Sequence, residues 1–206
     1  MDIAYRLSRL IFVVWLKLFH SLKVFGKENL PKKGPFICVP NHISFADPPV
    51  VGVACNTMPL HFMAKERLFE DKRWGWWFRW MDCIRISRDK KDYRAIKEVL
   101  KKLKEGKCAA IFPEGTRSES GELKAPELGV GFLAVKSNVP VIPFFLSGTE
   151  KALPINERYR VGVPVKVCIG KAVDFKGIEK IKDRKEKYRF VSNKIIQAIA
   201  ELKNAN

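Results

Sequence analysis

The stretch Pro35–Pro49, with the sequence PFICVPNHISFADPP, joins an apolar run to a polar loop and to the start of a helix. His42 and Asp47 follow the apolar run and are separated by four residues. A carboxylate bonded to one imidazole nitrogen fixes the tautomer, so the other nitrogen can accept a proton. The pair is two thirds of a hydrolase-type triad, and the rest of the chain must supply the nucleophile.

The end of this stretch predicts a helix N-terminus. Asp47 followed by two prolines is typical of an N-cap with proline at the first helical positions, so we expect a helix from Pro48 to about Cys55. Residues five apart on one helix point away from each other, because helix neighbours lie three or four residues apart. We therefore expect a loop to hold His42, closed by Asp47 at the cap.

Strand-like segments alternate with helical patterns along the chain, which predicts an α/β fold: a mixed, largely parallel central sheet flanked by helices. The chain of 206 residues is 47% hydrophobic and has no repeat or Pro/Gly/Ser-rich linker, which favours one core. We assign residues 29–206 to a single α/β domain. Strands are expected at 60–64, 83–86, 108–112, 139–146 and 161–169, and helices at 93–103, 129–138 and 188–202.

Residues 1–28 are assigned to an N-terminal membrane-associating helix. Ile3–Val24 is helix-prone, with an apolar centre at Leu10–Leu16 that is shorter than the ~20 residues of a spanning helix. No cleavage site of a secretory signal is visible. An interfacial or re-entrant anchor, with Leu10, Phe12 and Trp15 in the lipid and basic residues snorkelling to headgroups, is the preferred interpretation, and a buried core helix is the alternative.

A second segment concentrates tryptophan and basic side chains. Trp74–Trp80 has the sequence WGWWFRW and follows Lys72 and Arg73. This composition is typical of a membrane-interface belt, which would include Trp74, Trp76 and Trp77, although such a segment can also stack nucleotide bases or pack as core. The apolar N-terminus favours the membrane interpretation.

The net charge indicates the kind of partner, and the cysteines indicate the cellular compartment. The formal net charge is +17, which implies an anionic partner: a lipid surface, a phosphorylated substrate or nucleic acid. Five cysteines without metal-type spacing indicate reduced core residues in a cytosolic setting. The three scattered histidines do not form a zinc motif, and no Gly-x-x-x-x-Gly-Lys loop is present, so we expect no metal site and no ATP-driven reaction.

Another polar stretch, Phe112–Ser118 (FPEGTRS), follows a predicted buried strand. Sites in open α/β sheets usually lie at the carboxyl ends of strands. Backbone N–H groups, the Thr116 hydroxyl and the Arg117 guanidinium can together hold a phosphate, with arginine providing a bidentate fork. The alternative is an ordinary surface turn with a solvated arginine.

The sequence resembles the glycerophospholipid acyltransferases, especially the lysophosphatidic acid (1-acylglycerol-3-phosphate) acyltransferases. Their first motif, Asn-His-x4-Asp, is matched from Asn41 to Asp47, their third is matched in full at Phe112–Ser118, and their fourth at Val139–Pro143. The second motif departs, because Arg88 fits its arginine but Asp82 stands where the family usually has glycine. The resemblance covers roughly residues 35–170.

The resemblance implies a nucleophile that is not part of the protein. His42 would take the proton of a lysophospholipid's free glycerol hydroxyl, Asp47 would orient His42, and the oxygen would attack an acyl thioester. Lys65, in a segment similar to the family's Ala-Lys-x-Glu-Leu, would stabilise the oxyanion, or it is a solvated surface lysine. The resemblance assigns the acceptor phosphate to Arg88, Glu114, Gly115, Thr116 and Arg117, of which Glu114 is expected to accept loop N–H bonds or to position an arginine.

The implied activity is acyl transfer from acyl-CoA or an acyl carrier protein to lysophosphatidic acid, giving phosphatidic acid. No cofactor beyond the thioester is expected, and the implied partners are the lysophospholipid acceptor, the thioester donor and an anionic membrane surface, without nucleic acid. We expect a peripheral or monotopic protein at the cytoplasmic face of a membrane. The alternatives are the same chemistry on another lyso-lipid, or a non-catalytic basic module that binds membranes or nucleic acid.

Overall fold

The computed structural model describes residues 2–87 and 93–205. Within these ranges, seven strands form one sheet in the order β1-β7-β6-β2-β5-β3-β4. All neighbouring strands are parallel except β6 and β7, which are antiparallel. The predicted α/β fold with a mixed, largely parallel sheet is therefore confirmed. The strands are β1 (Leu22–Phe25), β2 (Ile37–Pro40), β3 (Leu60–Lys65), β4 (Ile84–Ile86), β5 (Cys108–Ala110), β6 (Val141–Ser147) and β7 (Val165–Ile169).

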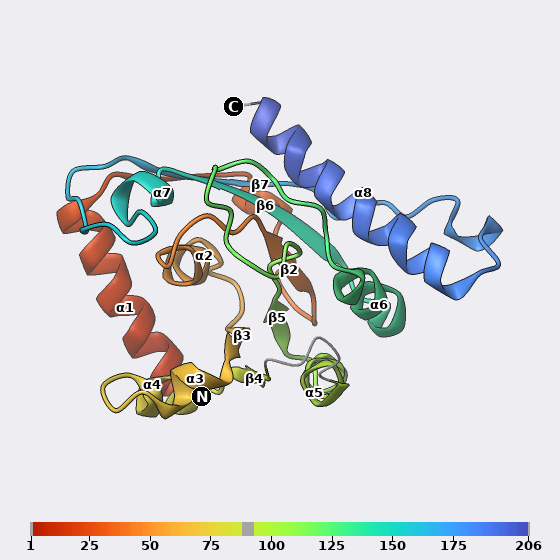
Figure 1. Cartoon of the computed structure of the whole chain (residues 1–206), viewed down its shortest axis with the longest axis horizontal. Coiled ribbons are helices and arrows are strands. Elements are labelled where there is room, and N and C mark those ends of the chain that lie inside the picture. Colours follow the sequence, from red (N-terminus) through yellow and green to blue (C-terminus); the bar gives the residue numbers. More distant parts are fainter. Residues whose placement is uncertain (1, 88–92, 206) are drawn as a thin grey trace.

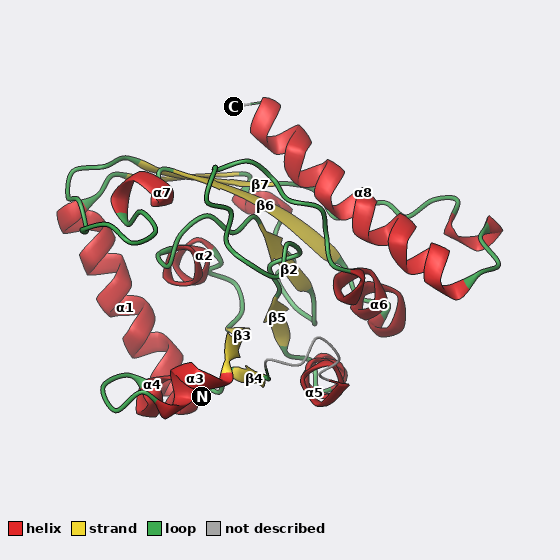
Figure 2. Ribbon diagram, in the orientation of Figure 1, coloured by secondary structure: helices red, strands yellow, loops and turns green. Residues whose placement is uncertain are grey.

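Helices cover both faces of the sheet (Figure 1). One apolar cluster joins one face to α1 and α2, and a second joins the other face to α5, α6 and α8. Figure 2 shows the helical layers on either side of the strands. The helices are α1 (Asp2–Phe19), α2 (Asp47–Ala54), α3 (Glu66–Glu70), α4 (Gly75–Trp80), α5 (Tyr93–Lys104), α6 (Leu128–Ser137), α7 (Thr149–Ala152) and α8 (Arg184–Asn204), with short 3-10 turns at Lys27–Asn29 and Ile178–Lys180.

Two predicted boundaries were wrong. The N-terminal helix ends at Phe19 rather than Val24, and Leu22–Phe25 is an edge strand that pairs with β7. The strand predicted from Val161 begins only at Val165. Gly162 has a left-handed backbone (φ 77°) and Pro164 has no N–H to donate, so the alternating valines before Val165 lie in a loop.

The N-terminal helix α1 is apolar on two faces. Its inner face packs against α2 and α4, where Tyr5 Oη donates to Gly52 O (3.2 Å) and Trp77 Nε1 donates to Ser8 Oγ (3.0 Å). Its outer face is exposed and carries a helically spaced apolar stripe. Within the described ranges, no helix combines the length and hydropathy needed to cross a bilayer. The stripe consists of Ile3, Leu7, Leu10, Ile11, Val14 and Leu18.

Asp82, which stands where the resembled family has glycine, adopts a left-handed backbone conformation with φ 53°. Its carboxylate accepts a hydrogen bond from Lys102 Nζ (2.7 Å) and lies 3.1 Å from His61 Nε2, and both partner side chains are buried. Burial opposes ionisation of Asp82, but the Lys102 cation and His61 outweigh it and lower the pKa of the carboxyl group. The interactions offset the strain of a non-glycine residue at this turn.

Candidate active site

The motifs meet at one edge of the sheet. Four parallel strands, β6, β2, β5 and β3, end at this edge, and the loops that follow them carry the predicted functional residues. β2 lies between β5 and β6, so the loop after β2 is flanked by the loops after both neighbours. The loop after β2 holds His42, the loop after β5 holds Phe112–Ser118, and β6 leads into Thr149.

His42 and Asp47 form the predicted pair. His42 Nδ1 lies 2.8 Å from Asp47 Oδ2, and the side chains are 18% and 0% exposed, respectively. The His42 ring also stacks on Phe112, with 3.9 Å between ring centroids. The imidazole is therefore fixed on one edge and one face while part of it remains accessible to solvent.

Asp47 does not cap a helix as predicted. It is the first residue of α2, and its Oδ2 accepts from the N–H groups of Ile43 (2.7 Å) and Ser44 (2.8 Å) in the preceding loop. The carboxylate thus folds the loop back onto itself and holds His42, as expected for a loop rather than a helix. Its other oxygen, Oδ1, accepts from Thr149 Oγ1 at 2.6 Å.

Asn41 and Ser44 attach this loop to the neighbouring strand β6 and its extension. The Asn41 side chain is buried, donating to Leu146 O (3.1 Å) and accepting from Leu146 N (2.7 Å). Ser44 Oγ donates to Leu153 O at 2.8 Å. The Ser44 hydroxyl therefore makes a structural hydrogen bond to the segment that follows β6.

Glu114 joins the two main motifs. Its Oε1 accepts from His42 N (2.8 Å) and its Oε2 from Lys124 N (3.0 Å), which confirms that it receives backbone N–H bonds. Ser118 N donates to His42 O (2.7 Å), so residue 42 is held by its backbone on both sides. Burial raises the pKa of Glu114, and the two N–H groups partly oppose this effect. Glu114 therefore links the loop after β2 to the loop after β5.

Arg117 has the features of an anion ligand. Its guanidinium carbon lies 3.5 Å from the centre of the Phe45 ring, and its Nη1 is buried without a hydrogen-bond partner among the described residues. Burial lowers the pKa of Arg117; the Asp47 carboxylate opposes this, whereas the nearby Arg67 cation adds to it. A buried donor without a partner is costly, so the position favours a bound anion.

The remaining residues of this loop are more open. Gly115 has φ 67°, and a Cβ atom there would lie 3.0 Å from Glu127 Cγ, so the turn requires glycine. Thr116 is exposed, and Lys124 Nζ donates to Arg117 O (2.6 Å) and to Thr116 Oγ1 (3.4 Å). Lys124, which sequence reasoning missed, braces the loop through both its backbone and its side chain.

Two predicted site residues are not brought to His42 by any contact described. Lys65 is the exposed last residue of β3, at the same edge of the sheet but with β5 between it and the His42 loop. Its role as an oxyanion ligand stays a prediction. Arg88 lies outside the described residues.

The predicted membrane residues divide into two groups. Leu10, Trp74 and Trp76 are exposed, whereas Phe12, Trp15 and Trp77 are turned inward and partly buried. Trp15 and Trp77 pack against the apolar cluster, and the Phe12 ring centre lies 6.2 Å from that of Trp15 and 6.0 Å from that of Trp77. The inward group therefore helps to attach α1 to the domain, and its assignment as lipid contacts stays a prediction.

The cysteines behave as core residues. All five are free, and Cys38, Cys55, Cys108 and Cys168 are buried. Burial raises the pKa of the Cys108 thiol to about 11, which disfavours a reactive thiolate. In the part of the chain that the structure describes, no group of three or more His, Cys, Asp or Glu side chains is arranged to hold a metal ion.

The His42–Asp47 pair, the buried Nη1 of Arg117 and the Phe112–Ser118 loop thus lie at the edge where the parallel strands β2 and β5 end. The family model named Acyltransferase matches residues 21–147, and the chain belongs to this family.

Among individual relatives, the 1-acyl-sn-glycerol-3-phosphate acyltransferase of Bacillus subtilis is 31% identical over 93% of this chain and 92% of the relative. The chloroplastic enzyme of the same name from Arabidopsis thaliana is 32% identical over 66% of this chain, which matches 38% of that longer relative. The crystal structure of the 1-acyl-sn-glycerophosphate (LPA) acyltransferase PlsC from Thermotoga maritima aligns with a TM-score of 0.76 at 30% identity, covering 98% of this chain and 79% of that chain.

Proposed function

We propose that this enzyme transfers an acyl group from a thioester, acyl-CoA or acyl carrier protein, to the free glycerol hydroxyl of lysophosphatidic acid, giving phosphatidic acid. The observation that carries the proposal is the His42–Asp47 pair near Arg117, whose Nη1 is buried without a hydrogen-bond partner in the described part of the chain. It is supported by relatives named 1-acyl-sn-glycerol-3-phosphate acyltransferases that match most of the chain.

The geometry of Asp47 indicates the direction of proton transfer. Oδ2 accepts two backbone N–H bonds, so this oxygen is an acceptor and His42 Nδ1 donates to it. Nε2 is then the basic nitrogen. It takes the proton of the acceptor hydroxyl as the oxygen attacks the thioester carbonyl. When the tetrahedral intermediate collapses, the C–S bond breaks and the imidazolium returns its proton to the leaving thiolate.

The acceptor phosphate is assigned to Arg117, assisted by the loop at Gly115 and Thr116. Arg117 Nη1 is a buried donor ready for a phosphate oxygen, and stacking on Phe45 fixes the plane of the guanidinium. The nearby Arg67 adds a second positive charge to this side of the site. The donor carries negative charge in either form, which suits a protein with a net charge of +17.

The test is acyl transfer by the purified protein in lipid or detergent dispersion. With lysophosphatidic acid and acyl-CoA or acyl carrier protein thioester, phosphatidic acid detected by mass spectrometry is the expected product. His42→Ala should abolish it while leaving the thermal midpoint near that of the parent. Product from His42→Ala at the parental rate would refute the assignment of the base. A panel of other lyso-lipids tests the acceptor, and a higher rate on one without a phosphate monoester would replace lysophosphatidic acid.

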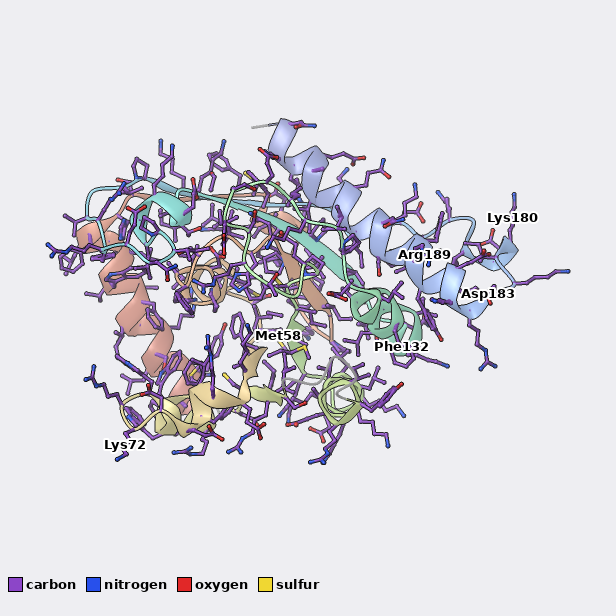
Figure 3. All side chains as sticks on the ribbon, viewed as in Figure 1. Met58, Lys72, Phe132, Lys180, Asp183 and Arg189 are labelled. Atoms are coloured by element: carbon purple, nitrogen blue, oxygen red, sulfur yellow. The ribbon has the colours of Figure 1, made fainter. Side chains whose placement is uncertain are left out.

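We also propose that the outer face of α1 rests on an anionic lipid leaflet. Its exposed apolar stripe continues at α4, where Trp74 and Trp76 are exposed. Exposed basic side chains border this surface: Arg6 and Lys17 on α1, and Lys72, which projects near α3 and α4 (Figure 3). An apolar surface with tryptophan and a cationic border matches the chemistry of a membrane interface. The five free cysteines agree with a reducing compartment on that side.

Vesicle binding tests this surface. Leu10→Glu should reduce partitioning onto vesicles of phosphatidylglycerol and phosphatidylcholine by about 10- to 100-fold, because a buried leucine contributes roughly 1.5–3 kcal/mol. The matched control is Tyr93→Glu, an equally exposed aromatic residue on α5. Equal binding of the two variants would contradict the proposal, as would dimerisation of the parent through α1 without vesicle binding.

A further inference from the structure

Thr149 is a buried hydroxyl that contacts the catalytic pair from a distant part of the chain. It is the first residue of α7, separated from the end of β6 only by Gly148, and it is 0% exposed. Its Oγ1 donates a hydrogen bond to Asp47 Oδ1 at 2.6 Å. The two residues are 102 positions apart in the sequence. The bond is therefore a tertiary contact, made at the edge of the sheet where β2 and β6 end side by side.

The two oxygens of Asp47 have different partners. Oδ2 accepts from His42 Nδ1, Ile43 N and Ser44 N, at 2.8, 2.7 and 2.8 Å. Oδ1 accepts from Thr149. A carboxylate can rotate about its Cβ–Cγ bond, and a buried oxygen without a donor favours such rotation. Thr149 occupies Oδ1, so Oδ2 stays directed at the imidazole.

The segment that carries Thr149 is itself fixed. Gly148 has φ 90°, and a Cβ atom at this position would lie 2.1 Å from Pro164 O, so only glycine allows the turn. At the other end of α7, Leu153 O accepts the Ser44 hydroxyl at 2.8 Å, and Ser44 Oγ accepts from Ala46 N at 3.1 Å. The catalytic loop is thus held at both ends of α7, which places the Thr149 hydroxyl rigidly.

We propose that Thr149 is a positioning residue of the catalytic base: its hydroxyl fixes the Asp47 carboxylate so that His42 presents Nε2 to the acceptor hydroxyl. The inference rests on the proposed function of His42 and Asp47. Thr149 touches neither substrate in this scheme, so it acts on the chemical step rather than on binding.

Two substitutions of Thr149 separate its hydroxyl from its shape. Thr149→Val keeps the volume of the side chain and removes the hydrogen-bond donor. We expect kcat to fall about 10- to 100-fold, while KM for both substrates stays within about twofold of the parent value. The expected loss is large because hydrogen bonds to charged groups are stronger than those between neutral groups. Thr149→Ser keeps the donor and should restore most of kcat. The control is Ser192→Ala on α8, which also removes a buried hydroxyl, hydrogen-bonded to Gly131 N and Glu127 O. It should lower the thermal midpoint without lowering kcat.

A double-mutant cycle completes the test. In an Asp47→Asn background, Thr149→Val should lower kcat by no more than about twofold, because its partner is already impaired. Unchanged kcat in folded Thr149→Val, equal losses in the Val and Ser variants, or additive losses with Asp47→Asn would overturn the proposal. Should Thr149→Val not fold, Thr149→Ala against Thr149→Ser decides in the same way. Failure of the proposed function can be distinguished from failure of the Thr149 proposal, because full activity of His42→Ala would contradict the proposed function whatever the result at Thr149.

Discussion

Replacing Arg117 tests whether its guanidinium binds the acceptor phosphate. Its Nη1 is buried without a partner among the described residues, so a phosphate oxygen would make a charge-assisted hydrogen bond there. Such bonds contribute about 1.5–3 kcal/mol, which predicts that Arg117→Ala lowers kcat/KM for lysophosphatidic acid by about 10- to 150-fold. For monoacylglycerol, which lacks the phosphate, the same substitution should change kcat/KM little.

Stability separates this effect from misfolding. Arg117→Ala loses the stacking on Phe45, about 0.5–1 kcal/mol, but also removes a buried unpaired donor, which costs about 1–3 kcal/mol. We therefore expect a thermal midpoint equal to or above that of the parent. Initial rates with both acceptors give the discrimination ratio, and Arg189→Ala, an exposed arginine on α8 (Figure 3), is the control. Equal losses on both acceptors would refute the assignment of Arg117 to the phosphate.

Three further predictions concern Glu114, Asp82 and His61. Glu114→Gln should lower the thermal midpoint by about 2–10 °C and reduce activity, because only the oxygen of an amide can accept a hydrogen bond, whereas Glu114 accepts one at each oxygen. An unchanged midpoint by calorimetry would contradict the role of Glu114 in linking the two loops. Asp82→Ala should be less stable than Asp82→Gly by about 1 kcal/mol in urea unfolding, because glycine relieves the left-handed backbone; the reverse order would exclude strain there. Burial lowers the pKa of His61, so below about pH 6.5 the imidazole takes up a proton in the unfolded chain more readily than in the folded protein. The free energy of unfolding should therefore fall as the pH falls in this range. Urea titrations at several pH values measure this dependence, and His61→Gln should make it weaker.

The loop that holds the His42–Asp47 pair could be predicted from the sequence because its hydrogen bonds join residues that are close together in the chain. His42 and Asp47 are five residues apart, and the carboxylate is held by N–H groups of the residues between them. Proline after Asp47 correctly indicated a helix start, but not that the Asp47 side chain turns back toward the loop. Asp47 is the first residue of the helix, but its Oδ2 bonds to His42 Nδ1 and to the N–H groups of Ile43 and Ser44 in the preceding loop.

Long-range contacts were beyond such reasoning. Thr149 and Lys124 reach the site through tertiary structure, and neither belongs to the recognised motifs. A signal for Thr149 was available, since it follows a buried strand at the edge where α/β sites form. The short strand Leu22–Phe25 was not predicted because no glycine or proline separates it from α1. A four-residue edge strand also gives a weak signal, because only half of its side chains need to be apolar.

The position of β2 between β5 and β6 explains why so many contacts converge on one histidine. Groups from the β5 side, Phe112, Glu114 and Ser118, contact the ring or backbone of His42. From the β6 side, Leu146 holds Asn41 and Thr149 holds Asp47. If His42 acts as the proposed base, being held from both sides means that it needs little reorganisation when the proton moves. Substitutions among these holding residues should therefore act on kcat, whereas changes at Arg117 should act on the choice of acceptor, and this division can be measured residue by residue.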